Sequence, residues 1–169
     1  MVIWPDKQTS KQFALIVAVI IILDYISKIY MLSLIFDPPR VIELMPILNL
    51  APVWNEGISF GLFQDGGRII RFGIAGLAAI VAVWLFFQLP SLPKWQKIAA
   101  GFIAGGALGN AIDRMIYGKV VDFVDFHLGN WHYPAFNVAD SAIFIGVILW
   151  IITLWWDAKK AQPQKDEKG

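Results

Sequence analysis

Acidic side chains stand in two short apolar segments, where a carboxylate is costly if it enters lipid. In the segment "FNVADSAIF", Asp140 is the only ionisable residue of a long apolar stretch that continues to Trp156. The segment "VVDFVDF" adds two acids, Asp122 and Asp125, among valines and phenylalanines. If Asp140 met one of these acids, the two carboxyl groups could not both ionise cheaply, so one would keep its proton. The ionised group could activate a water as general base while the protonated one polarised a carbonyl, which is chemistry that hydrolyses an amide.

Each of these acids also has a simpler interpretation. The spacing of Asn137 and Asp140 is that of a helix N-cap followed by an acid at the third helical position, so Asp140 could serve only as a cap. The segment "VDFVDFHLGNW" is typical of a short amphipathic helix or turn at a membrane interface, from which Asp122 and Asp125 would point to water. The residues alone do not decide which of these two acids is the partner of Asp140.

The composition is that of a membrane protein. The chain has 169 residues, of which 57% are hydrophobic and 16% are charged, and its mean hydropathy is +0.60. Soluble domains average about 45–50% apolar and about 25% charged residues. We therefore expect a single membrane domain over residues 1–169. Cysteine is absent, which excludes disulfides, thiol nucleophiles and cysteine metal ligands.

Four apolar segments are each close to the roughly 20 residues that cross about 30 Å of hydrocarbon. They are residues 13–36, 69–89, 98–116 and 138–156. The predicted fold class is therefore an all-α membrane protein with four transmembrane helices. The outer segments, 37–68 and 117–137, are rich in apolar and aromatic residues, and we expect short strands in the first of them. The tail from 160 to 169 is expected to be disordered.

Four spans put both termini on one side of the membrane, and the positive-inside rule indicates which side this is. Eight basic residues lie on the side of the termini: Lys7, Lys11, Lys94, Lys97, Lys159, Lys160, Lys165 and Lys168. Five lie on the opposite side: Arg40, Arg68, Arg71, Arg114 and Lys119. We therefore predict cytoplasmic termini. In this topology the polar residues of the spans converge near the outer interface, where a charge costs less than at the bilayer centre.

Asp24 and Lys28 stand one helical turn apart in the first span, with the acid N-terminal to the base. This is the favoured order for a helical ion pair, and we interpret it as a structural pair that neutralises itself in the membrane. His127 and His132 are the only histidines, and without cysteine or an H-E-x-x-H motif they are a weak metal signal. We therefore expect neither a metal nor a cofactor.

The third span carries a ridge of small residues, because Gly101, Gly105 and Gly109 recur every four residues. Such a ridge lets another helix approach closely. Asn110 and Arg114 are also one turn apart, so close packing of this helix would fix the direction in which both side chains point.

Five motifs, in this order, extend over nearly the whole chain. They read "LDYISK", "WNEGISFGLF", "GGALGNAIDR", "GKVVDFVDF" and "FNVADSAI". In these motifs and in their order the sequence resembles lipoprotein signal peptidase (signal peptidase II), a family of bacterial intramembrane aspartic peptidases. Each motif is a moderate signal alone, whereas five in order within one small four-span protein are specific.

The resemblance implies that Asp122 and Asp140 are the catalytic pair and that they activate water without a cofactor. It implies supporting or substrate-binding roles for a second group of residues: Asn55, Gly57, Asn110, Arg114, Asn137, Asp24 and Lys28. It also implies a small extracytoplasmic β-sheet beside the site and an interfacial flap in the segment that follows Asp122.

The implied reaction removes the signal peptide of a prolipoprotein just before a diacylglyceryl-modified cysteine. The implied partners are this substrate, membrane lipids and cyclic peptide inhibitors such as globomycin. The implied location is the bacterial cytoplasmic (inner) membrane, with the active site near the outer face. Two other functions are compatible with the same acids: a small transporter, which the nearly uncharged inner half-spans disfavour, and a scaffold in which Asp140 only caps a helix.

Overall fold

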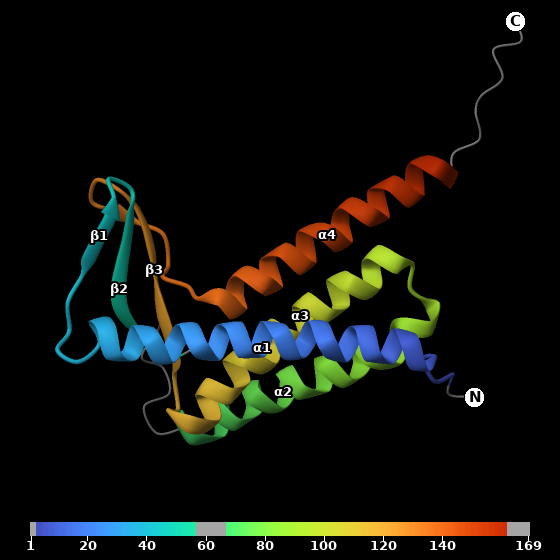
Figure 1. Cartoon of the computed structure of the whole chain (residues 1–169), viewed down its shortest axis with the longest axis horizontal. Coiled ribbons are helices and arrows are strands. Elements are labelled where there is room, and N and C mark those ends of the chain that lie inside the picture. Colours follow the sequence, from blue (N-terminus) through green and yellow to red (C-terminus); the bar gives the residue numbers. More distant parts are fainter. Residues whose placement is uncertain (1–2, 57–66, 162–169) are drawn as a thin grey trace, which may run out of the picture.

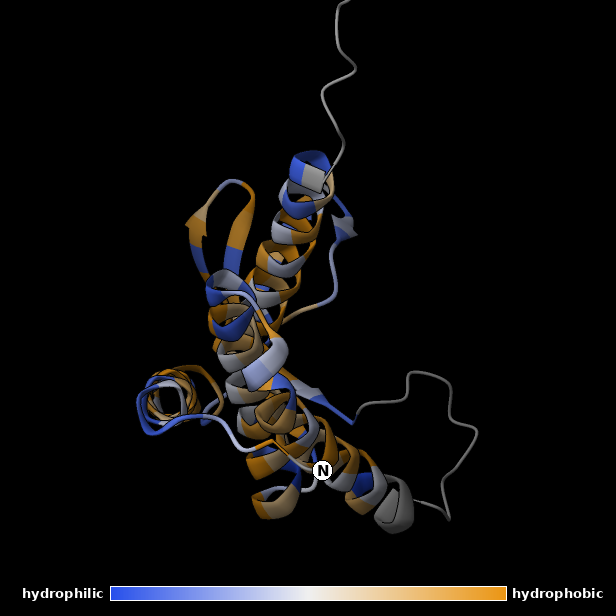
Figure 2. Cartoon of the chain, turned by 90° about the vertical axis from the view of Figure 1, so that its right-hand side faces the viewer, coloured by the Kyte–Doolittle hydropathy of each residue, from blue (hydrophilic) through white to orange (hydrophobic). Residues whose placement is uncertain are grey.

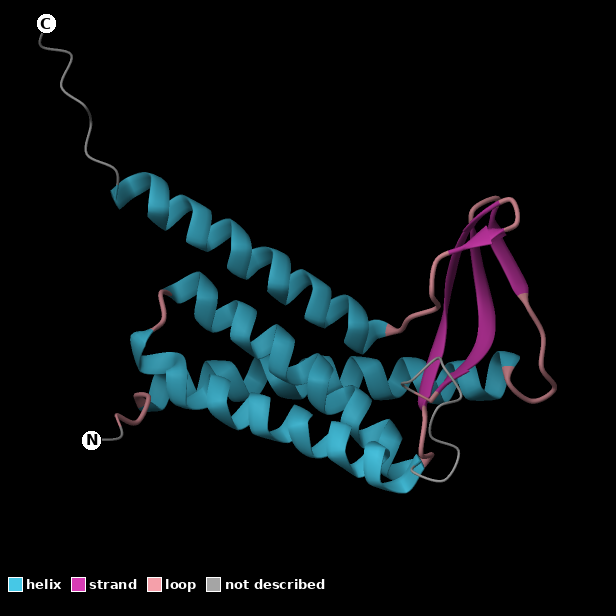
Figure 3. Ribbon diagram, turned by 180° about the vertical axis from the view of Figure 1, so that it is seen from behind, coloured by secondary structure: helices cyan, strands magenta, loops and turns pink. Residues whose placement is uncertain are grey.

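The computed structural model describes residues 3–56 and 67–161 (Figure 1). The elements in chain order are α1 (Lys7–Ile35), β1 (Ile42–Met45), β2 (Leu48–Asn55), α2 (Gly67–Gln88), the short 3₁₀ helix η1 (Leu89–Ser91), α3 (Lys94–Ile116), β3 (Val120–Leu128), β4 (Trp131–His132) and α4 (Val138–Ala161). The sheet lies at one end of the helices, whereas α1 begins and α4 ends at the opposite end (Figures 1 and 3). Most of the predicted disordered tail, and Gly57, lie outside the described residues.

The long first helix begins and ends at clear local signals. The side chain of Asp6 caps it by accepting hydrogen bonds from the backbone N–H groups of Gln8 and Thr9, both at 2.9 Å. The helix ends at Ile35, shortly before the Pro-Pro pair at 38–39, where the missing N–H groups cannot continue helical hydrogen bonding.

The central helix of the bundle is α3, which packs against α1, α2 and α4. The predicted glycine ridge is confirmed, because its residues face Ile16, Ile20 and Asp24 of α1 in turn: Gly101, Gly105 and Gly109. A Cβ atom added at Gly105 would lie 2.9 Å from the Cβ atom of Ile20, closer than side chains approach one another. The absence of side chains on this ridge therefore sets the distance between α1 and α3.

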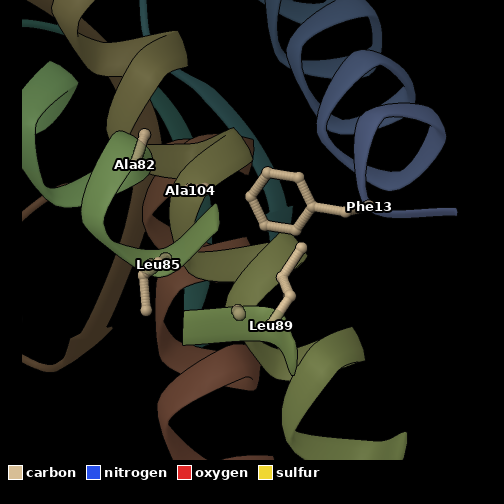
Figure 4. Close-up of a cluster of buried hydrophobic side chains, with 6 residues drawn as sticks. Phe13, Ala82, Leu85, Leu89 and Ala104 are labelled. Atoms are coloured by element: carbon tan, nitrogen blue, oxygen red, sulfur yellow. The ribbon is translucent and has the colours of Figure 1, made fainter. Parts of the chain in front are cut away.

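A cluster of buried apolar side chains closes the other side of α3 (Figure 4). It joins α1, α2, η1 and α3 through six residues: Phe13, Ala82, Leu85, Leu89, Ala100 and Ala104. The helices consist largely of hydrophobic residues (Figure 2), and many of the large ones are exposed, such as Ile80 at 66% and Phe144 at 67%. An outer surface this apolar suits a lipid environment rather than water.

Within the described residues, three helices are long and apolar enough to cross a membrane: Lys7–Ile35, Arg71–Ser91 and Val138–Lys160. Three of the four predicted spans therefore correspond to such helices, and the predicted span at 98–116 does not. The helix α3 occupies that segment but is rich in glycine and alanine and buries Asn110 and Asp113 against its neighbours. A helix enclosed by three others needs less apolar surface, which explains its lower hydropathy.

The sheet is antiparallel with the order β1-β2-β3-β4, and β3 pairs with β2 from a distant part of the chain. The prediction of a short amphipathic helix or turn at "VDFVDFHLGNW" is wrong, because most of this segment belongs to the strands β3 and β4. The segment after Asp122 is thus part of the sheet instead of a separate interfacial flap. Asp122 pairs with Val53, and Asp125 pairs with Asn49. Because successive side chains alternate between the faces of a strand, these two acids, three residues apart, point to opposite faces.

Replacing Gly105 by leucine should destabilise the fold, because the new side chain would overlap Ile20 in the contact between α1 and α3. Overpacking of this kind costs about 1–3 kcal/mol or more. The matched control is Gly76→Leu in α2, where an added Cβ would meet nothing within 4 Å. We expect a lower thermal unfolding temperature in detergent for the first variant only. Equal melting of the two variants would contradict the close packing.

Candidate active site

Asp140 lies in the first turn of α4 and is half-buried. Its backbone N–H donates to Oδ1 of Asn137 at 2.9 Å, and its Oδ2 accepts the backbone N–H of Asn137 at 3.3 Å. This reciprocal pair is a capping box, so the predicted helix cap is confirmed. The cap uses one oxygen of Asp140, and the other accepts a hydrogen bond from the side-chain amide of Asn110 at 2.7 Å.

Asp122 is fully buried in β3, and two amides hold its two oxygens. Nδ2 of Asn137 donates to Oδ1 at 2.6 Å, and Nδ2 of Asn55, at the end of β2, donates to Oδ2 at 2.8 Å. Asn137 therefore contacts both Asp122, through its side chain, and Asp140, through the reciprocal cap. The structure brings these two acids to one site, whereas Asp125 faces the other side of the sheet.

Asn110 has a defined orientation because each end of its amide meets a group of the right kind. Its Oδ1 accepts hydrogen bonds from Nζ of Lys28 at 3.1 Å and from Nδ2 of Asn137 at 3.0 Å. Its Nδ2 must then point away, toward the carboxylate of Asp140. The buried lysine thus fixes the amide that holds the acid.

The predicted ion pair of Asp24 and Lys28 is confirmed, with Nζ 2.7 Å from Oδ2, but it does not neutralise itself alone. Lys28 also lies 2.9 Å from Oδ2 of Asp113, so one cation serves two buried carboxylates. Both acids also accept backbone N–H groups: Asp24 that of Ala139 in α4, and Asp113 that of Val121 in β3. The cluster therefore ties α1, α3, α4 and β3 together beside the acid pair.

Asp113 is the residue of this site to which sequence reasoning assigned no role. It is 3% exposed and touches a base in α1 and a backbone group in β3. Its position three residues after Asn110, on the same helical face, was the available signal. Arg114, one turn after Asn110, is half-buried and donates from Nη1 to the carbonyl oxygen of Asn110 at 3.2 Å. It also lies within electrostatic reach of both Asp140 and Asp122.

The two acids of β3 differ in their electrostatic environment. Burial raises the pKa of Asp122 to about 6, and the nearby charge of Asp140 adds to this effect, while the hydrogen bonds from Asn55 and Asn137 oppose it. Burial alone would also raise the pKa of Asp125, but hydrogen bonds from His132 and Asn49 outweigh it and hold that pKa below its usual value. Of these two acids, Asp122 is therefore the one poised to exchange a proton near neutral pH.

Asp140 opens onto an apolar groove of about 560 Å³ between the sheet and α4. The groove is lined mainly by aromatic and aliphatic side chains: Phe126, Trp131, Tyr133, Phe136, Phe144 and Ile145. Phe144 and Ile145 belong to the exposed outer surface of α4, so the groove leads from the carboxylate to the side of the helix that faces lipid. In the parts of the chain that the structure describes, no three histidine, aspartate or glutamate side chains are arranged to hold a metal.

Solved structures share this architecture. One of them, described as a bacterial membrane enzyme determined by the in meso method, has a TM-score of 0.71 and 30% sequence identity, covering 93% of this chain and 95% of its own. The apolar helices, the sheet at one end and the buried polar site thus define the fold of a bacterial membrane enzyme.

A family model described as "Signal peptidase (SPase) II" matches residues 16–156. A lipoprotein signal peptidase of Alteromonas mediterranea is 38% identical over 166 residues, 96% of this chain and 89% of the relative. That of Hydrogenovibrio crunogenus is 40% identical over 155 residues, 89% of this chain and 87% of the relative. The chain belongs to the signal peptidase II family, and membership makes it a peptidase. The match includes all five motifs and each described residue of the site.

Replacing Lys28 by methionine should destabilise the protein strongly, because Asp24 and Asp113 would lose the cation between them. Removing one partner of a buried ion pair costs about 3–5 kcal/mol. The matched control is Lys11→Met, an exposed lysine of the same helix. We expect the unfolding temperature in detergent to fall for the first variant and to stay near that of the wild type for the second. If both melt like the wild type, the cluster does not hold the helices together.

Proposed function

We propose that this chain is an aspartic endopeptidase that removes the signal peptide from diacylglyceryl-modified prolipoproteins, cutting just before the lipidated cysteine. Membership of the signal peptidase II family and relatives named lipoprotein signal peptidase support the substrate class. The observation that carries the mechanism is the hydrogen bonding of both Asp122 and Asp140 to one residue, Asn137.

In the proposed reaction the two carboxyl groups share one proton. The ionised group takes a proton from a water molecule, whose oxygen attacks the carbonyl carbon of the peptide bond before the cysteine. The protonated group donates a hydrogen bond to the carbonyl oxygen and stabilises the negative charge that develops there. Proton transfer to the leaving nitrogen then breaks the carbon–nitrogen bond, which yields a carboxylate on the signal peptide and an amine on the cysteine.

The surrounding amides supply the positioning that this chemistry needs. Asn55 and Asn137 hold Asp122, while Asn110 and the helix cap hold Asp140, so each carboxylate is held in a defined orientation. We assign Arg114 to the binding of a substrate carbonyl, because it lies near both acids.

Three supporting residues remain. Two of them act through another residue, and the third lies outside the described part of the chain. Asp24 and Lys28 act through Asn110 and are positioning residues. Gly57 follows Asn55 and Glu56 directly in the sequence, and we assign it a role beside the substrate from its place in the family motif.

We propose that α3 also crosses the membrane, which makes four spans. Its polar residues are shielded by α1 and α4, and its exposed surface is small. With both termini cytoplasmic, the sheet and the acid pair lie near the outer face of the bacterial inner membrane, where water is available. The diacylglyceryl chains of the substrate would stay in lipid beside the apolar groove of α4. A cyclic peptide inhibitor such as globomycin would block the same groove.

Each of Asp122→Asn and Asp140→Asn should reduce cleavage of a lipid-modified prolipoprotein by at least about 10³-fold, because asparagine can neither take nor give the proton. The measurement is a gel-shift assay with purified protein in detergent. Asp125→Asn is the matched control, since this acid lies on the same strand and faces away, and it should keep activity close to that of the wild type.

The variants should fold like the wild type, because asparagine preserves the size of both side chains. Circular dichroism checks this. Substantial cleavage by folded Asp140→Asn would leave Asp140 as a mere helix cap and contradict the mechanism. Loss of activity in Asp125→Asn, with the other two variants active, would contradict the assignment of Asp122 and Asp140 as the catalytic pair.

A further inference from the structure

We propose that a cavity between the first turns of α1 and α3 binds the headgroup of an anionic phospholipid. The cavity has a volume of about 740 Å³. It lies where α1 begins, at the end of the helices opposite the sheet and the acid pair (Figure 1). Its lining includes Lys94 and Lys97 from α3 and the side-chain amides of Gln8 and Gln12 from α1. This site is separate from the proposed peptidase site and does not depend on it.

The cavity lies where the glycine ridge of α3 ends. Gly101 is the first glycine of the ridge, and a Cβ atom added to it would lie 2.9 Å from Cγ2 of Ile16 in α1. The position one turn before Gly101 on the same face of α3 is Lys97. A long charged side chain there replaces the glycine, so α1 and α3 cannot close on one another. The two helices are therefore closely packed at Gly101, Gly105 and Gly109 and leave the cavity beside Lys97.

The cavity carries an excess of positive charge. In the part of the chain that the structure describes, neither Lys94 nor Lys97 forms an ion pair. The acid of the cavity is Asp6, which lies within electrostatic reach of Lys97. Its carboxylate oxygens already accept hydrogen bonds: Oδ1 from the N–H groups of Gln8 and Thr9, and Oδ2 from the hydroxyl of Thr9. No side chain caps the start of α3, where helical N–H groups and the helix dipole also favour an anion. The cavity is lined by two cations and one acid, and this net positive charge favours a negatively charged ligand.

The apolar part of the cavity indicates a lipid instead of a soluble anion. Leu15, Ile16 and Ile98 line it on the side of the membrane interior, so acyl chains could leave the headgroup along the helices. Trp4 and Trp95, at the same end of the bundle, are 67% and 52% exposed, as is typical of aromatic residues at headgroup depth. Basic pockets between membrane helices of this kind suit phospholipid phosphates.

The test is lipid binding to the full chain in detergent, measured by native mass spectrometry with phosphatidylglycerol, phosphatidylcholine or phosphatidylethanolamine. We expect the wild type to prefer phosphatidylglycerol, and we expect Lys94→Gln with Lys97→Gln to weaken its binding by about tenfold or more. The matched control is Lys159→Gln with Lys160→Gln at the exposed end of α4, which should keep the preference. Cleavage of prolipoprotein in detergent should be unchanged in both.

Amine-reactive labelling of the wild type provides a second measurement that needs no variant. Phosphatidylglycerol should protect Lys94 and Lys97 from labelling but leave Lys159 and Lys160 reactive. Equal binding of the three lipids, or full binding by the doubly substituted chain, would overturn the proposal. Equal protection by inorganic phosphate at the same concentration would overturn the assignment to a lipid.

Discussion

The requirement that the buried carboxylates of the site find hydrogen-bond donors determines how this protein is built around Asn137. A carboxylate removed from water is costly unless donors hold it, and Asp122 is completely buried. Asn137 meets this need for Asp122 with its side chain, and it closes the first turn of α4 with Asp140. One residue therefore joins the start of α4 to β3, and both acids are hydrogen-bonded to it.

The cluster around Lys28 extends this constraint to the rest of the fold. Its two acids accept backbone groups of α4 and β3, so the same charges that would be costly in lipid hold the helix and the strand in place. They can do so only because Gly109 lets α3 approach Asp24 closely. Close helix packing, ion pairing and the geometry of the acid pair are thus one connected arrangement rather than three separate features.

Local patterns in the sequence predicted the helices, the glycine ridge, the cap at Asn137 and the pair of Asp24 and Lys28. Those features depend on residues within a turn or two of each other. The strand β3 was missed because its pairing partner, β2, lies far away in the chain, and the role of Asp113 was missed because its partners belong to α1 and β3. The segment of α3 looked like an ordinary span, although three helices surround it.

The central claim is that Asp122 and Asp140 form one electrostatically coupled pair, and titration of Asp122 tests it most directly. Selectively ¹³C-labelled carboxyl groups of the protein in detergent would report the pKa of Asp122 by NMR, with Asp122→Asn assigning the signal. In the wild type this pKa should be about 6, mainly because of burial. In Asp140→Asn it should fall, because a neighbouring negative charge is removed. An unchanged pKa of Asp122 in that variant would contradict the account.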